Sequence, residues 1–171
     1  LKQTLRALTE RLQAAKDYAQ ARAVFLEHEQ QVIHMQTLAT LASVRHTIDT
    51  RDEFYDAEET FWNAASPELD EFEDAWKGAM LESPFRKEFA SEFGDLMFVN
   101  AEIARKAFSP EIIPESQQEN DLSQAYSKLI ASAQIPFEGG VYTISQLSPF
   151  KNDPDDARRL AAWQAEGAWY K

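Results

Sequence analysis

The sequence contains no cysteine. This absence excludes disulfide bonds, zinc sites built on thiolates and catalysis by a cysteine nucleophile. It fits a cytoplasmic protein, and we expect that localisation. The sequence also has no apolar run long enough to span a bilayer and no signal peptide at its start, so we expect no membrane partner.

Basic residues are scarce. Lys and Arg number 17 against 29 Asp and Glu, which gives a net charge of −12 at pH 7. Such a surface repels nucleic acid and anionic lipid, so we expect no nucleic-acid partner. Hydrophobic residues make up 44% of the 171 residues, which is enough to form a buried core.

Helix-breaking residues are few, with five Gly in all and no Gly or Pro before Pro67. The sequence therefore favours long helices. The central helix is expected over Phe25 to Asp49, where apolar or histidine side chains recur every three or four residues. This face comprises Phe25, His28, Val32, Met35, Ala39, Ala42 and His46. A second row, formed by Ile33, Leu41, Val44 and Ile48, is expected to widen the same buried stripe.

Further helices are expected on both sides of the central one. Leu1, Leu5, Leu8 and Leu12 predict a first helix, which either continues into the central one or bends near Lys16 and Asp17. Asp49 or Thr50 is expected to cap the next helix. Its expected buried face is Phe54, Ala57, Phe61, Ala64 and Ala65, continued by Leu69, Phe72, Trp76 and Met80. At Ser66-Pro67 either two helices meet or one is kinked.

The pattern continues with shorter helices after Ser83-Pro84, over Leu96 to Phe108 and from Leu122, following a polar stretch over Glu111 to Glu119. Residues 134–142 predict two short strands around a Gly139-Gly140 turn. Thr143 and Gln146 form a capping box. Asp153, as N-cap, and Pro154 open the last helix, with Leu160, Trp163 and Gly167 on one face. The fold class is therefore mainly α, an antiparallel helical bundle with one hairpin, and we expect a helical lobe over 1–133 followed by a second part over 134–171.

The three histidines give little support for a metal site. A zinc helix needs two His four residues apart, whereas His28 and His34 are six apart and project from different sides of a helix. A di-iron bundle needs Glu three residues before His, and no His here has one. We therefore interpret the histidines as structural.

Other chemically capable residues also have simpler interpretations. Asn152 to Asp156 lacks the Gly and the ligand spacing of an EF-hand, and helix capping explains it. Gly139-Gly140 is followed by no Lys-Ser/Thr, so it predicts a turn rather than a phosphate loop. Ser43 and Ser145 have no base nearby in the pattern. His46 and Asp49 are three residues apart, and we expect a local ion pair, with an interdomain junction as the alternative.

Two segments carry a family resemblance. The first is Ala42-Ser43-Val44-Arg45-His46-Thr47-Ile48-Asp49-Thr50, followed by an acid-rich helix. The second is Ile135-Pro136-Phe137-Glu138-Gly139-Gly140-Val141-Tyr142-Thr143-Ile144-Ser145-Gln146-Leu147, then Asp153-Pro154-Asp155-Asp156-Ala157-Arg158-Arg159-Leu160-Ala161 after a short gap. Their order and spacing resemble the N-terminal portion of the oligoendopeptidase F family, within the thimet-like zinc metallopeptidases.

The resemblance implies a helical lobe of a two-lobed peptidase that hydrolyses internal bonds of short peptides. In that family a zinc ion, held by His-Glu-x-x-His and a downstream Glu, lies C-terminal to this region, and the first lobe walls the substrate channel. No such motif occurs here, so we expect no catalytic, cofactor-binding or metal-binding residue and no peptidase activity from these residues alone. Residues 134–171 would then begin the helices that join a missing catalytic domain.

That domain and an oligopeptide substrate are the expected partners, and exposed apolar surface is expected to mark the docking face. The alternative is a free-standing acidic helical protein-interaction module that recruits a basic partner.

Overall fold

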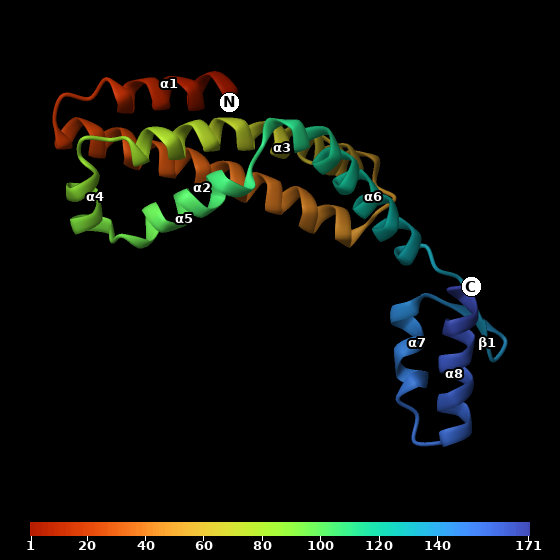
Figure 1. Ribbon diagram of the computed structural model, residues 1–171. Helices are drawn as coiled ribbons and strands as arrows, with labels where there is room; N and C mark the ends of the chain where they lie inside the picture. The colour runs from red at the N-terminus through yellow and green to blue at the C-terminus, as the bar shows by residue number, and fades with distance from the viewer. The chain divides into compact units, whose positions relative to one another are not determined.

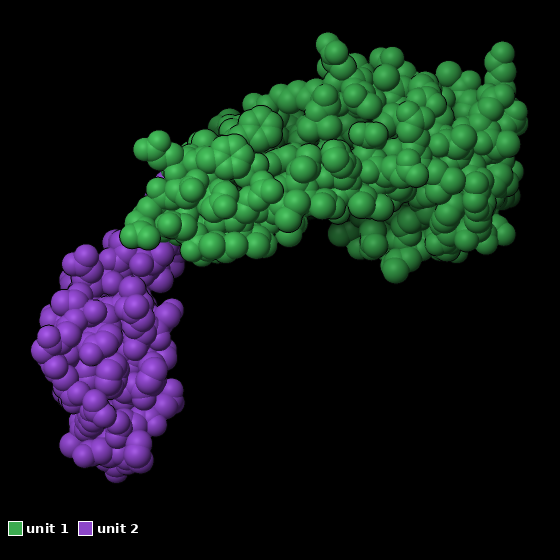
Figure 2. All heavy atoms as spheres, turned by 180° about the vertical axis from the view of Figure 1, so that it is seen from behind, with its two compact units in different colours: residues 1–121 green, residues 122–171 purple.

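The computed structural model describes all residues, 1–171, and is mainly α, as the sequence predicted (Figure 1). The chain forms two compact units, unit 1 over Leu1–Asp121 and unit 2 over Leu122–Lys171 (Figure 2). The elements are α1 (Lys2–Gln13), α2 (Tyr18–Ile48), α3 (Glu53–Leu81), α4 (Arg86–Phe93), α5 (Leu96–Ala107), the 3-10 helix η1 (Pro110–Ile112), α6 (Ile113–Ala131), β1 (Ile135–Phe137), β2 (Gly140–Tyr142), α7 (Ile144–Lys151) and α8 (Asp156–Trp169).

Helix α2 is the longest helix and packs against α1 and α3. Its N-cap is Asp17, whose Oδ1 accepts a hydrogen bond from Gln20 N at 2.8 Å, so the chain bends between α1 and α2 rather than continuing as one helix. The predicted buried face is confirmed: Phe25, His28, Met35, Ala42 and His46 are buried. Val32 and Ala39, on the same face, are half-buried.

The main core of unit 1 forms where α1, α2, α3, α4 and α5 meet. Phe89 of α4 belongs to this core and is fully buried, and its ring centroid lies 5.1 Å from that of Tyr18 and 5.4 Å from that of Phe25. Leu8 and Leu12 of α1 belong to the same core. Leu5 instead packs with Met35 and Leu69 in a smaller cluster. The short α4 ends at Gly94, whose φ of 90° is readily adopted only by glycine.

Helix α3 is one continuous helix that contains Pro67. A proline has no N–H to donate to the carbonyl four residues before it, here that of Asn63. In the structure Asn120 Nδ2 of α6 donates to Asn63 O at 3.0 Å, and Gln117 Nε2 donates to Ala64 O at 2.7 Å. Side chains of α6 thus bond to the backbone of α3 at the turn that the proline alters.

The start of α3 differs from the prediction. Asp52, rather than Asp49 or Thr50, is the N-cap, and its Oδ1 accepts from Phe54 N and Tyr55 N at 2.9 and 3.0 Å. Asp49 instead bonds to Arg51, with Oδ1 3.1 Å from Nε.

Two predicted buried faces are wrong. The second row of α2 is exposed, with Ile33 at 61% and Ile48 at 75% of full accessibility, because α1 and α3 contact α2 from its other side. In the first half of α3, Phe54 and Phe61 are also exposed. The expected face of its second half is confirmed, since Leu69, Trp76 and Met80 are buried and Phe72 is half-buried.

Helix α6 begins at Ile113, well before the Leu122 expected from the apolar spacing. Ser109 caps the preceding 3-10 turn by accepting from Glu111 N at 3.4 Å. The polar stretch over Glu111 to Glu119 is therefore largely helical. Polar residues suit an exposed helix, so the absence of apolar spacing did not indicate a loop.

Unit 2 contains the predicted hairpin, but its turn lies one residue earlier than expected. The turn residues are Glu138 (φ 45°) and Gly139 (φ 80°), and Gly140 belongs to β2, opposite Phe137. Positive φ at both central positions is the geometry that matches the twist of a two-residue hairpin. The hairpin packs on α7 and α8 through Ile135, Phe137, Leu147 and Ala162.

The loop before α8 is organised by Arg158. Its Nη2 lies 2.7 Å from Glu138 Oε2 and its Nη1 lies 2.8 Å from Asp153 Oδ2. The N-cap of α8 is Asp155 rather than the predicted Asp153, whose Oδ1 accepts from Asp155 N at 2.9 Å. Asp155 Oδ1 accepts from Ala157 N at 2.8 Å. The face of α8 predicted to contain Leu160 and Trp163 is exposed, and Ala162 and Glu166 are buried instead.

The capping box at the start of α7 is confirmed, since Gln146 N donates to Thr143 Oγ1 and Thr143 N to Gln146 Oε1. None of the helices combines the length and the apolar content needed to cross a membrane.

The core predicts a sharp contrast between two phenylalanines. Phe89→Ala removes a fully buried ring and leaves a cavity, so we expect it to lower the free energy of unfolding by about 3–5 kcal/mol. Phe54→Ala, at a side chain 63% exposed, is the matched control and should change it by less than about 0.5 kcal/mol. Urea unfolding followed by circular dichroism measures both; equal effects would show that Phe89 is not a core residue.

Candidate functional site

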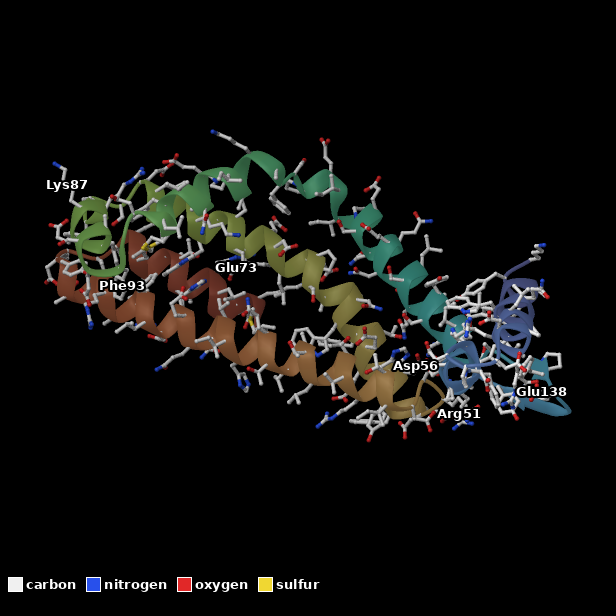
Figure 3. All side chains as sticks on the ribbon, turned by 90° about the horizontal axis from the view of Figure 1, so that it is seen from below. Arg51, Asp56, Glu73, Lys87, Phe93 and Glu138 are labelled. Atoms are coloured by element: carbon white, nitrogen blue, oxygen red, sulfur yellow. The ribbon has the colours of Figure 1, made fainter.

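His28 is the most deeply buried polar side chain of unit 1, at 2% of full accessibility. The spacing of α2 points it at α3, where its ring stacks on that of Trp76 with centroids 3.8 Å apart and planes 4° from parallel. Its Nε2 lies 3.2 Å from Glu73 Oε1 and its Nδ1 lies 3.5 Å from Glu29 Oε1. Figure 3 labels Glu73 on α3. His28 therefore lies between two carboxylates and against an aromatic face.

The charge of His28 depends on two opposing effects. Burial is the largest single effect and lowers the pKa of the ring, because it disfavours the charged form. The carboxylates of Glu29 and Glu73 act in the opposite direction, and together they raise the pKa of His28 above its ordinary value. When the ring is protonated, its positive charge lies beside two acidic side chains, Glu29 on α2 and Glu73 on α3.

Two open grooves border this cluster, and Val32, Glu73 and Lys77 line both. The first, of about 360 Å³, is further lined by Met35, Gln36, Ala39, Trp62, Ser66, Leu69 and Asp70. The second, of about 270 Å³, is further lined by Phe25, His28, Glu29, Trp76, Met80, Met97, Phe98, Asn100, Ala101 and Ala104. Both are mainly apolar with a few charged groups, which is the usual character of ligand-binding surfaces.

The charged groups in the grooves are mostly acidic. Burial raises the pKa of Asp70; Lys77 opposes this shift and Glu73 adds to it. No group of three or more His, Cys, Asp or Glu side chains lies close enough to hold a metal ion. The grooves are suited to binding an apolar chain bearing an occasional polar group.

The histidines lie as follows. His28 is buried and His34 is exposed, so they project from different sides of α2, as their spacing predicted. His46 is buried, but its partner is not the expected Asp49: His46 Nε2 lies 3.4 Å from Asp56 Oδ1 of α3. The interaction is therefore a contact between helices rather than a local pair within the end of one helix.

The remaining sequence candidates have the following positions. Ser43 and Ser145 are exposed, on α2 and α7. Asp153 forms an ion pair with Arg158, and Asp155 accepts hydrogen bonds from the backbone of the first turn of α8. Glu73, Asp70 and Lys77 were missed by the sequence analysis. The available signal was their position around Trp76, on the turns of α3 next to its predicted buried face.

His28 predicts a pH-dependent contribution to stability. A group whose pKa is raised by folding stabilises the folded state below its unfolded pKa, and this contribution is lost as the pH rises through the folded pKa. His28→Phe keeps a ring on Trp76 but removes the charge. We expect it to lower the free energy of unfolding by about 1–3 kcal/mol at pH 5.5, where it leaves the carboxylates without their charged partner. The loss should be smaller at pH 9.

Urea unfolding at both pH values measures this loss. His34→Phe, at an exposed position of the same helix, is the control and should show no such trend. A His28→Phe effect that stays constant from pH 5.5 to pH 9 would contradict the charged interaction.

Comparison with known proteins identifies the family. The family model for the peptidase M3 N-terminal domain matches residues 1–108. Comparison with curated proteins gives no match.

Solved structures match nearly the whole chain. A structure of PZ peptidase A with an inhibitor is 34% identical, with a TM-score of 0.94, over 99% of this chain and 30% of its own. An oligoendopeptidase F structure is 34% identical, with a TM-score of 0.93, over 98% of this chain and 30% of its own. An oligoendopeptidase F structure from Bacillus anthracis str. Ames is 32% identical, with a TM-score of 0.93, over 98% of this chain and 31% of its own.

The present chain thus spans about 30% of the length of these structures, and both units fall within the matched region. Identity above 30% over almost the whole chain, together with the family match over most of unit 1, agrees with the resemblance read from the sequence. The chain belongs to the peptidase M3 N-terminal domain family.

Proposed function

We propose that this chain is the non-catalytic N-terminal lobe of a zinc-dependent oligoendopeptidase of the cytoplasm. The observation that carries the proposal is the match of the whole chain to about 30% of oligoendopeptidase F structures. The remainder of those chains has no counterpart among these 171 residues, and we assign the chemistry of peptide hydrolysis to the corresponding part of this protein. The lobe described here would wall the substrate channel.

Zinc would be held outside this lobe, because the histidines present do not fit a zinc site. The ring nitrogens of His28 lie 3.5 and 3.2 Å from the carboxylates of Glu29 and Glu73, and its ring stacks on Trp76. His34 projects from another side of α2, and His46 contacts Asp56. A tetrahedral zinc site needs three or four ligands converging on one point, and these side chains do not converge.

The contribution of this lobe would be to bind and position the peptide. The 360 Å³ groove offers Trp62, Met35 and Leu69 as apolar contacts, with Glu73 and Lys77 beside them. Short peptides without a fold expose apolar side chains and free backbone groups, so they can occupy an open apolar groove. A folded protein buries those side chains and would gain little from the same surface.

The alternative function is a free-standing acidic interaction module, for which the net charge of −12 is the supporting observation. The parent reading frame distinguishes the two proposals. A continuation of a few hundred residues with a His-Glu-x-x-His motif supports the peptidase. A frame without that motif supports the module.

The proposal predicts that residues 1–171 alone are inactive. We expect no hydrolysis of a fluorogenic oligopeptide, with the full-length protein as the positive control, because the proposal assigns the zinc ion that activates water to the remainder of the polypeptide. Metal analysis of the purified lobe should give far less than one zinc per chain. Hydrolysis that co-purifies with the lobe, or stoichiometric zinc bound to it, would overturn the assignment.

A further inference from the structure

A row of apolar side chains runs along the exposed side of α2. We call it the outer row; it consists of Ile33, Leu41, Val44 and Ile48, which are 61%, 43%, 50% and 75% exposed. At 1.5 Å per residue the row is about 22 Å long. No other element of unit 1 covers it, since α2 packs against α1 and α3 through the face that contains His28, Met35 and Ala42.

The two apolar faces of α2 lie on opposite sides of the helix. On a 3.6-residue repeat, Ile33 and Val44 are about half a turn away from His28, Met35 and Ala42. A helix at the surface of a finished fold has one apolar face and one polar face, whereas a helix that is apolar on both sides is covered on both. The outer row therefore has the character of a buried surface.

The charge pattern gives independent support. Residues 30–44 contain no Asp, Glu, Lys or Arg, although charged residues make up 27% of the chain. About four would be expected in a stretch of that length at the average content. The exposed polar residues within it are Gln30, His34, Gln36, Thr37, Thr40 and Ser43. Depletion of charge around exposed apolar residues distinguishes the centre of an interface from ordinary surface.

We propose that the outer row of α2 is the docking face for the remainder of the same polypeptide. This inference rests on the proposed function. The chain matches 30% of the PZ peptidase A chain, which leaves about 70% of such a chain available to cover this face. A covalently attached domain is present at high effective concentration, which favours it over any free partner. An apolar face that carries no charged residue over positions 30–44 also fits a permanent interface, which resembles a protein core divided in two.

The other occupants fit less well. The surfaces offered to a peptide, the two grooves on the other side of α2, do carry charged groups, among them Glu73 and Lys77. The outer row has none within residues 30–44. A second copy of the chain would bring the same net charge of −12 to the contact and would be repelled at long range.

Cysteine labelling of the full-length protein tests this inference, because residues 1–171 contain no cysteine of their own. Val44→Cys and Ile33→Cys are compared with Lys87→Cys, an exposed position on α4 that projects outward (Figure 3). The unsubstituted protein gives the background. In the folded protein we expect a maleimide to label the two α2 variants at least about 100-fold more slowly than Lys87→Cys, because labelling of the outer row requires the interface to open. In urea, where the interface is lost, all three variants should be labelled equally fast.

Each other outcome overturns the inference. Fast labelling that a competing oligopeptide prevents would show that the outer row lines the peptide channel. Protection that disappears on dilution would show contact between two copies. Fast labelling under all conditions would show an uncovered surface. A full-length protein without peptidase activity would contradict the proposed function instead, and because labelling does not depend on activity the two failures are distinguishable.

Discussion

The packing of one face of α2 against α1 and α3 is the contact on which unit 1 depends. Small residues let the helices approach closely, since Ala21 and Ala42 are completely buried. Larger side chains on the same face, such as Phe25 and Met35, extend into two separate apolar clusters. The face is long because nothing in its sequence interrupts the helix, and it places His28 against Trp76 and borders both grooves. The geometry of the candidate site thus follows from the periodicity of a single helix.

The sequence predicted the elements that local chemistry determines. The buried face of α2, the hairpin and the capping box at Thr143 all follow from spacing or turn residues within a few positions. The N-cap residues were predicted less well. Asp52 caps α3, where Asp49 or Thr50 was predicted, and Asp155 caps α8, where Asp153 was predicted. In each region several oxygen-bearing side chains lie within three residues and any of them can cap. In each region one of these side chains also binds an arginine, since Asp49 bonds to Arg51 and Asp153 bonds to Arg158.

The candidate site was less accessible to sequence reasoning, for a related reason. His28 and His46 were identified as buried positions, but their acidic partners Glu73 and Asp56 lie on α3, tens of residues away in the chain or across a loop. Apolar residues that recur every three or four positions along a helix indicate which of its sides faces a neighbour. They do not indicate which side chains the neighbour presents. The same limit explains the outer row of α2: its apolar pattern predicted a buried surface, but within unit 1 the row is exposed.

Pro67 has a consequence for the evolution of unit 1. Its ring removes the backbone N–H that position 67 would otherwise donate to the Asn63 carbonyl, and Asn120 of α6 donates to that carbonyl. Gln117 bonds to the next carbonyl along, so a short ladder of amide side chains secures α6 at this turn. A related chain with an ordinary residue at position 67 would satisfy the carbonyl from its own backbone and would lose the reason to retain an amide at position 120. The identities at positions 67, 117 and 120 should therefore covary among homologous sequences, although α4, α5 and η1 lie between the first of them and the other two.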